Sequence, residues 1–149
     1  MNIELNGSEQ INASPANLWE SVIDPAVLQR AIPGCISMTE TGEGQYQMAL
    51  ELKVAAVGGS FEGAVSLSEM SPPHSCVITV SGSGTLGTGG GNATVAITEG
   101  DDGNALISYQ AQGEVSGLVA GVGQRILMGV AKHLARQFFT ALKKEFAAA

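Results

Sequence analysis

Apolar and polar residues alternate along the chain from Cys35 to about Val115, without a helical period between them. A period of two predicts β-strands that bury one face and expose the other to water. Gly, Pro, Asn and Asp clusters separate the alternating segments and predict turns. Because no helix intervenes, we expect consecutive strands to pair as an antiparallel meander. The strands are expected near residues 46–54, 61–67, 76–80, 93–98 and 106–115.

A strand and two short helices are expected before this meander. Apolar residues at odd positions between residues 3 and 11 predict a first strand with one exposed face. Ser14-Pro15 and then Asp24-Pro25 have the composition of a helix N-cap followed by proline in the first turn. The second helix must end before Ile32-Pro33, because the residue before a proline is disfavoured in the helical conformation.

A helical period returns at about Leu118 and continues to Phe146, roughly 29 residues or about 43 Å at 1.5 Å per residue. Its apolar residues fall within one stripe, which predicts a long helix packed on the sheet. The fold class is therefore α+β, with a curved antiparallel sheet around a long C-terminal helix, in one domain spanning residues 1–149. The apolar stripe comprises Val119, Val122, Ile126, Leu127, Val130, Leu134, Phe138 and Leu142.

Charge divides the chain into two parts. The net charge is −7, but five of the seven basic residues lie between residues 118 and 149. The first 117 residues carry only Arg30 and Lys53 as basic residues. The acidic body argues against general nucleic-acid binding, which needs many Lys and Arg contacts to phosphate. A cationic helix over an acidic, strand-rich body suggests a container with a differently charged lid or docking element.

Residues suited to catalysis or metal binding are few. His74 lies in a Pro-Pro turn, and His133 lies at the border of the apolar stripe. Cys35 and Cys76 are isolated, and they fit small buried side chains better than a disulfide framework or a zinc site. We therefore expect no catalytic residue, metal or cofactor.

A glycine-rich segment follows the strand near residues 76–80. Residues 82–87 match the dinucleotide pattern G-x-G-x-x-G, but residues 92–98 continue as a strand, whereas that motif must lead into a helix. We therefore interpret the segment as a turn or a β-bulge. For the neighbouring residues we hypothesise a flexible hairpin loop that gates the entrance of a cavity. This loop would comprise Gly87, Gly89, Gly90 and Gly91.

A long helix laid across a curved sheet leaves a tapered space, which can hold an apolar molecule. The alternative is a fully packed interior, since proteins usually exclude voids. The residues expected to line the cavity are Trp19, Met48, Leu50, Phe61, Val65, Ile107, Tyr109, Ile126 and Val130.

Several segments resemble those of a known family. The most distinctive are Ala31–Cys35 (AIPGC) and Gly117–Gly123, a Gly-rich segment that leads into a helix with Phe138-Phe139 near its end. The match covers nearly the whole chain. The chain resembles proteins with the helix-grip fold of the START-like (SRPBCC) superfamily, and in particular the G-subunit family of carbon monoxide dehydrogenase. Further matching segments are Pro15–Trp19 (PANLW), Asp24-Pro25 with Leu28, Phe61–Gly63 and Pro72-Pro73.

This resemblance implies a non-catalytic accessory protein that helps a molybdenum hydroxylase of the carbon monoxide dehydrogenase type to reach the membrane. It also implies a hydrophobic pocket for a lipid or a quinone. The longer members have a C-terminal linker or anchor, which this sequence does not show after Phe146. We therefore expect a cytoplasmic protein with at most peripheral contact at the inner membrane face. The surface expected to dock a partner or the membrane comprises Arg125, Lys132, Arg136, Phe139 and Lys144.

Two other functions stay open at the level of sequence. One is an enzyme acting on a cyclic apolar substrate, as some helix-grip relatives do. It would require polar side chains such as Tyr109, Cys76 or His133 to face a pocket together. The other is a pure interaction module that uses the basic helix face to dock an acidic partner.

Overall fold

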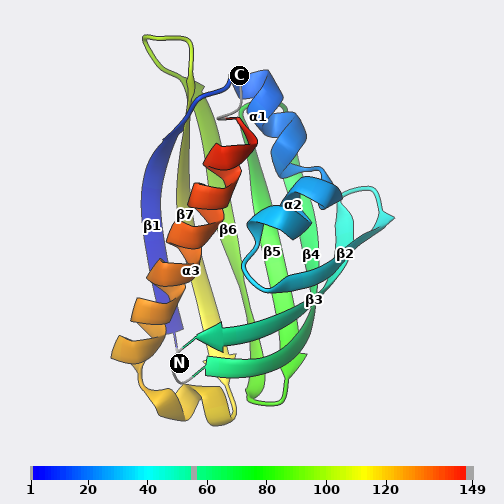
Figure 1. The fold of residues 1–149 in the computed structure, drawn as a ribbon, viewed down its shortest axis with the longest axis vertical. Helices are drawn as coiled ribbons and strands as arrows, with labels where there is room; N and C mark the ends of the chain where they lie inside the picture. Colours follow the sequence, from blue (N-terminus) through cyan, green and yellow to red (C-terminus); the bar gives the residue numbers. More distant parts are fainter. Residues whose placement is uncertain (1, 55–56, 147–149) are drawn as a thin grey trace.

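The computed structural model describes residues 2–54 and 57–146. Seven antiparallel strands form one curved sheet in the order β1-β7-β6-β5-β4-β3-β2 (Figure 1). Every neighbouring pair except β1 and β7 is consecutive in the chain, as the meander prediction requires. The strands are β1 (Asn2–Ile11), β2 (Cys35–Gly42), β3 (Gln45–Val54), β4 (Val57–Ser71), β5 (Ser75–Gly84), β6 (Gly87–Glu99) and β7 (Ala105–Ser116).

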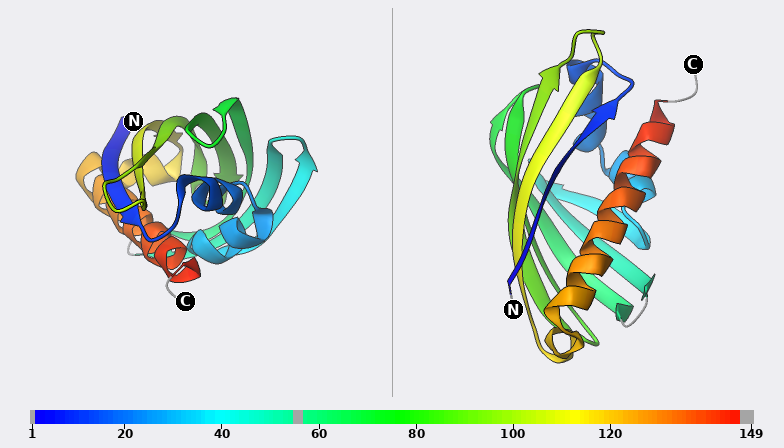
Figure 2. Two further views of the ribbon diagram at one scale, coloured as in Figure 1. Left: turned by 90° about the horizontal axis from the view of Figure 1, so that it is seen from above. Right: turned by 90° about the vertical axis from the view of Figure 1, so that its left-hand side faces the viewer.

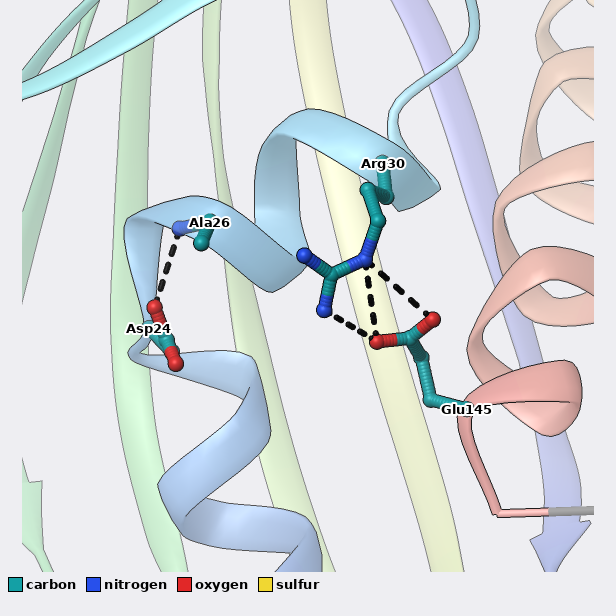
Figure 3. Close-up of polar contacts among 4 residues, drawn as sticks. All are labelled: Asp24, Ala26, Arg30 and Glu145. Carbon is teal, nitrogen blue, oxygen red and sulfur yellow. Dashed lines mark hydrogen bonds and ion pairs between the residues drawn. The ribbon is translucent and has the colours of Figure 1, made fainter. Parts of the chain in front are cut away.

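Two short helices follow β1, as predicted. Helix α1 (Pro15–Val22) is capped by Ser14, whose hydroxyl oxygen accepts the Asn17 N–H at 3.2 Å. Helix α2 (Pro25–Ala31) is capped by Asp24, whose carboxylate accepts the Ala26 N–H at 2.9 Å (Figure 3). Each cap satisfies a backbone donor that the first helical turn leaves unpaired. Together, the order of the elements and the seven-stranded antiparallel sheet confirm the expected helix-grip fold class.

The long C-terminal helix is shorter than the sequence predicted. Residues Leu118–Val122 form a separate 3₁₀ helix, η1, and helix α3 spans Gln124–Glu145. Gly123 separates them with a φ of +102°. An L-residue rarely adopts this conformation, so the α-helix cannot continue through the position. The apolar period continues across this break, which is why the sequence pattern suggested a single helix.

The glycine-rich segment is strand rather than loop, so the prediction of a flexible gate at residues 87–91 is wrong. Gly82 pairs with Gly89, and Gly91 pairs with Gly113, in the ladders β5–β6 and β6–β7. The hairpin between β5 and β6 turns at residues 85–86 instead. Glycine has no side chain, so this part of the strand shows no alternation of apolar and polar residues from which a strand could be predicted.

The sheet curves around α3, which crosses its concave side (Figure 2). Helix α3 packs mainly against β1 and α2. Two exposed ion pairs join its C-terminal end to these neighbours. Arg30 of α2 binds both carboxylate oxygens of Glu145 (Figure 3), and Lys143 Nζ lies 3.5 Å from Glu9 Oε1 on β1.

The space between the helices and the sheet is filled unequally along its length. One end, which we call the packed end, is the cluster of buried residues where α1 and the C-terminal half of α3 meet the sheet. A second buried cluster on β2–β4 includes Tyr46, whose hydroxyl donates to the Ile23 carbonyl at 2.8 Å. The packed end contains Ile11, Ala13, Leu18, Trp19, Val27, Cys76, Val95, Ile97, Ala105, Ile107, Phe139 and Leu142.

Candidate ligand cavity

An apolar cavity of about 460 Å³ lies between η1, the N-terminal half of α3 and the sheet. Its volume falls in the range of small-molecule pockets, about 300–1,000 Å³. We call this part of the molecule the cavity end. The inward-facing residues that line it are Ile3, Leu5, Met48, Leu50, Leu52, Phe61, Gly63, Ile78, Val80, Gly82, Gly87, Gly89, Gly91, Ala93, Ala111, Gly113, Val115, Val119, Leu127, Val130, Ala131 and Leu134.

Glycines on neighbouring strands create most of the space at the floor. Gly63 on β4 pairs with Gly82 on β5, which pairs in turn with Gly89 on β6. Gly91 and Gly113 form a further pair between β6 and β7. Because successive residues of a strand point to opposite faces, these glycines all occupy inward-facing positions. At Gly63 and Gly91 a Cβ atom would lie 2.5 Å and 2.3 Å from a carbonyl oxygen of the neighbouring strand, so only glycine fits there. Part of the cavity floor is therefore bare backbone.

The polar residues beside the cavity belong to the outer face of the sheet. Glu62, Ser81 and Thr88 alternate with the inward-facing residues and are exposed. The Thr88 hydroxyl, for example, shares a hydrogen bond of 2.8 Å with the Ser116 hydroxyl opposite it on β7. These side chains therefore do not enter the cavity.

The roof of the cavity comes from η1 and α3. Val119 of η1 is buried in one cluster with Leu127 and Val130 of α3. The Val119 N–H also donates to the Leu86 carbonyl at 2.7 Å, which fixes η1 to the β5–β6 turn. Val119 and Leu127 lie in the apolar stripe predicted from the sequence, but they were not among the residues expected to line the cavity.

Four of the nine residues expected to line the cavity do so: Met48, Leu50, Phe61 and Val130. The other five lie elsewhere, which corrects their expected placement. Trp19, Ile107 and Tyr109 belong to or pack against the packed end, and Val65 lies in the cluster around Tyr46. The fifth, Ile126, is 47 % exposed. Relative to the predicted apolar stripe, α3 is rotated about its axis, which turns Ile126 outward at one end of the helix and Phe139 inward at the other.

The docking surface expected on α3 changes in one residue. Arg125, Lys132, Arg136 and Lys144 are all exposed. Phe139, in contrast, is only 7 % exposed, and its ring stacks on Tyr109 with centroids 5.3 Å apart. The expectation that Phe139 lies on the outer surface is therefore wrong, and the four cations remain as the candidate docking residues.

The side chains needed for the enzymatic alternative do not meet at the cavity. Tyr109 packs under Phe139, Cys76 is buried in the packed end, and His133 is exposed on α3. Burial raises the pKa of the Cys76 thiol, so it stays protonated near neutral pH. Burial, and to a smaller extent the charge of Glu9, also raises the pKa of Tyr109.

Two observations bear on metals and membranes. Within residues 2–54 and 57–146, no three His, Cys, Asp or Glu side chains gather where they could hold a metal ion. None of the helices in the described part of the chain has the length and hydropathy that crossing a bilayer requires. Residues 147–149, which bear on a C-terminal anchor, lie outside the described residues.

Comparison with known proteins places the chain in a family. The family model of CoxG, the G-subunit of carbon monoxide dehydrogenase, matches residues 7–147. The chain belongs to this family. The resemblance inferred from the AIPGC and Gly-rich segments is thus confirmed. No curated protein sequence is detectably similar to the chain.

Solved structures of related shape support the same fold. A conserved protein from Geobacillus kaustophilus is 33 % identical, with a TM-score of 0.93 over 99 % of this chain and 95 % of that one. The Zhui aromatase/cyclase from Streptomyces sp. R1128 is 12 % identical, with a TM-score of 0.73 over 98 % and 94 % of the two chains. XoxI from Bacillus cereus is 15 % identical, with a TM-score of 0.66 over 97 % and 96 %. The last two comparisons concern the fold alone.

Proposed function

We propose that this CoxG-family protein is a non-catalytic accessory protein that binds one apolar molecule, a lipid or a quinone, in the cavity under α3. The single observation that carries this proposal is the cavity of about 460 Å³ with an apolar lining. An apolar hollow of this size, open to solvent on one side, leaves its lining side chains without packing contacts, which favours a role in binding.

Membership of the CoxG family supports the accessory role. We propose that the protein assists a molybdenum hydroxylase of the carbon monoxide dehydrogenase type at the inner face of the cytoplasmic membrane. The candidate docking surface is the exposed cationic face of α3. Arg125, Lys132 and Arg136 recur at intervals of seven and four residues, which places them on one side of the helix. Glu145, the acidic residue of this helix, is already paired with Arg30.

Ligand binding is tested by native mass spectrometry of the protein purified from its own host, before and after organic extraction. We expect one apolar molecule per chain, which extraction removes. Gly82→Leu should weaken retention of the adduct, because the new side chain occupies part of the cavity. Ser83→Leu is the matched control, since Ser83 is the next residue on β5 and faces outward. A wild-type protein without any adduct before extraction would contradict the binding role.

Partner binding needs a separate test. We expect subunits of a molybdenum hydroxylase to co-purify with the protein, and their genes to lie beside its own. Reversing the charge of Arg125, Lys132 and Arg136 to Glu should abolish co-purification without loss of folding or of the bound molecule. Unchanged co-purification would count against docking through α3. Co-purification with an empty cavity would favour the pure interaction module.

The enzymatic alternative has less support. It requires polar groups that converge on the ligand, whereas Tyr109, Cys76 and His133 lie apart from the cavity. Turnover of a cyclic apolar substrate by the purified protein would nevertheless restore it.

A further inference from the structure

The inward-facing residues that line the cavity have one property in common. Among the residues that the structure describes, each of them is apolar or is glycine. The polar side chains nearby, such as Asn92 and Gln112, are exposed and alternate with the lining residues. The cavity therefore offers an enclosed ligand no hydrogen bond from a side chain.

The backbone of the glycine floor offers none either. The glycine floor lies on β4 to β7, and each of these strands is paired on both sides. The ladders run without interruption through Gly63–Gly82, Gly82–Gly89 and Gly91–Gly113. Their N–H and C=O groups are consequently used within the sheet.

These two properties decide which part of an amphiphilic ligand can be enclosed. A polar group transferred into such a site loses its hydrogen bonds to water and gains none. A methylene group gains from the same transfer. The carbonyl oxygens of a quinone ring and the head group of a lipid both belong to the first class, and their hydrocarbon tails belong to the second.

The shape of the floor supports the same assignment. The glycines lie on four adjacent strands, β4 to β7. Gly63, Gly82 and Gly89 form one row across β4 to β6, roughly 10 Å long because neighbouring strands are about 4.8 Å apart. Gly91 and Gly113 continue this track one inward-facing position further along β6 and β7. A track of this kind fits an extended chain laid across the strands.

We propose that the cavity encloses the hydrocarbon tail of its ligand, and that the polar head stays outside. This inference rests on the proposed function and specifies it further. Recognition by the cavity then depends on the length of the tail and hardly on the chemistry of the head. A lipid and a quinone with similar tails are thus equivalent ligands of the cavity.

The test is a series of affinities measured by calorimetry on the full chain after organic extraction. Three sets of ligands are used, with an alcohol, a carboxylate or a quinone ring as the head group. Each set contains the same series of hydrocarbon tails of increasing length. We expect each added methylene to lower Kd about fourfold, equivalent to about 0.8 kcal/mol, until the cavity is full. Exchange of the head should change Kd less than about threefold, and a quinone ring without a tail should not bind measurably. A tailless ring that binds as tightly as a tailed one would overturn the inference, as would a Kd independent of tail length.

Variants locate the effect in the cavity. In Gly82→Leu, the tail length at which Kd stops falling should become shorter, while Ser83→Leu should leave it unchanged. Leu134→Ala enlarges the cavity and should shift the limit to longer tails, which keeps the test decisive if Gly82→Leu does not fold. If the tail length at which Kd stops falling is unchanged in both Gly82→Leu and Leu134→Ala, enclosure of the tail is contradicted. If no ligand of any set binds, the proposed function fails as well, whereas binding that follows the head overturns only this inference.

Discussion

The packed end and the cavity end of the molecule are built from the same strands and the same helix, yet one is solid and the other is hollow. Along β6, the inward-facing residues Val95 and Ile97 fill the packed end, whereas Gly87, Gly89 and Gly91 stand at the cavity end. The register of β6 with its neighbours is continuous through both regions. The cavity thus results from side-chain size along the strands and needs no break in the backbone.

Helix α3 shows the same division. Its C-terminal half contributes Phe139 and Leu142 to the packed end, and the ion pairs of Glu145 and Lys143 are also there. Its N-terminal half begins at Gln124, directly after Gly123, and contributes the aliphatic roof of the cavity. We infer that the packed end supplies most of the stability that lets the other end remain hollow.

The largest effect is expected from Phe139→Ala. This substitution should lower the free energy of unfolding by about 3–5 kcal/mol, because it removes a buried ring that stacks on Tyr109. Chemical denaturation of the extracted protein measures the change. Arg136→Ala on the exposed face is the control and should stay within about 0.5 kcal/mol. Loss of partner binding by Phe139→Ala at unchanged stability would return Phe139 to the docking surface.

A matched pair of leucines on α3 compares the two ends directly. Leu142 is 1 % exposed at the packed end, and Leu127 is 5 % exposed at the cavity end. Substitution of either by Ala should destabilise by about 2–5 kcal/mol, with Leu142→Ala at least about 1 kcal/mol more costly. The reason is that Leu142→Ala opens a new void, whereas Leu127→Ala enlarges an existing one. Equal losses in denaturation experiments would mean that the two ends are equally well packed.

Two glycines of the cavity floor should respond in opposite ways to the same substitution. A Cβ atom at Gly91 would lie 2.3 Å from the Gln112 carbonyl oxygen, whereas at Gly82 the nearest atom, the Glu62 oxygen, is at 3.4 Å. Gly91→Ala should destabilise by about 1–3 kcal/mol through overpacking. Gly82→Ala should be neutral or stabilising by up to about 1 kcal/mol, since it reduces the freedom of the unfolded chain. Melting temperatures give the order, and a stabilised Gly91→Ala would contradict the close approach of β6 and β7.

The smallest effect concerns the outer surface of the roof. Gly129 is exposed in the N-terminal half of α3, and a Cβ atom there meets nothing within 4 Å. Gly129→Ala should stabilise the protein by about 0.5–1 kcal/mol through helix propensity alone. Ligand affinity should stay unchanged in the same calorimetric assay. A weaker affinity would show that the cavity end depends on flexibility of this half of the helix.

The sequence predicted the elements whose signals are local. Ser14-Pro15 and Asp24-Pro25 indicated two helices because a cap and a proline act within one turn. Alternation around Tyr46 and Val65 identified strands and their inward faces, because that period is intrinsic to the pleat. The resemblance carried by the AIPGC segment added the family.

The position of each residue along the length of the cavity could not be predicted. Alternation tells which face Ile107 and Gly113 occupy, but not which of them lies beneath the open part of the helix. The rotation of α3 was equally hidden. The helical period placed Ile126 within the apolar stripe and Phe139 outside it, whereas the contact of Phe139 with Tyr109 turns Phe139 inward. These features depend on packing between segments that are far apart in the chain.

The pairing of β1 with β7 has a consequence for the order in which the protein can fold. Ile11 pairs with Ala105 and Asn2 with Glu114, so β1 finds its partner only after about a hundred further residues have been made. The hairpins from β2 to β7 can form as they emerge, because each closes a short loop. Strand β1 must therefore remain unpaired while the other strands are made, and its pairing with β7 completes the sheet.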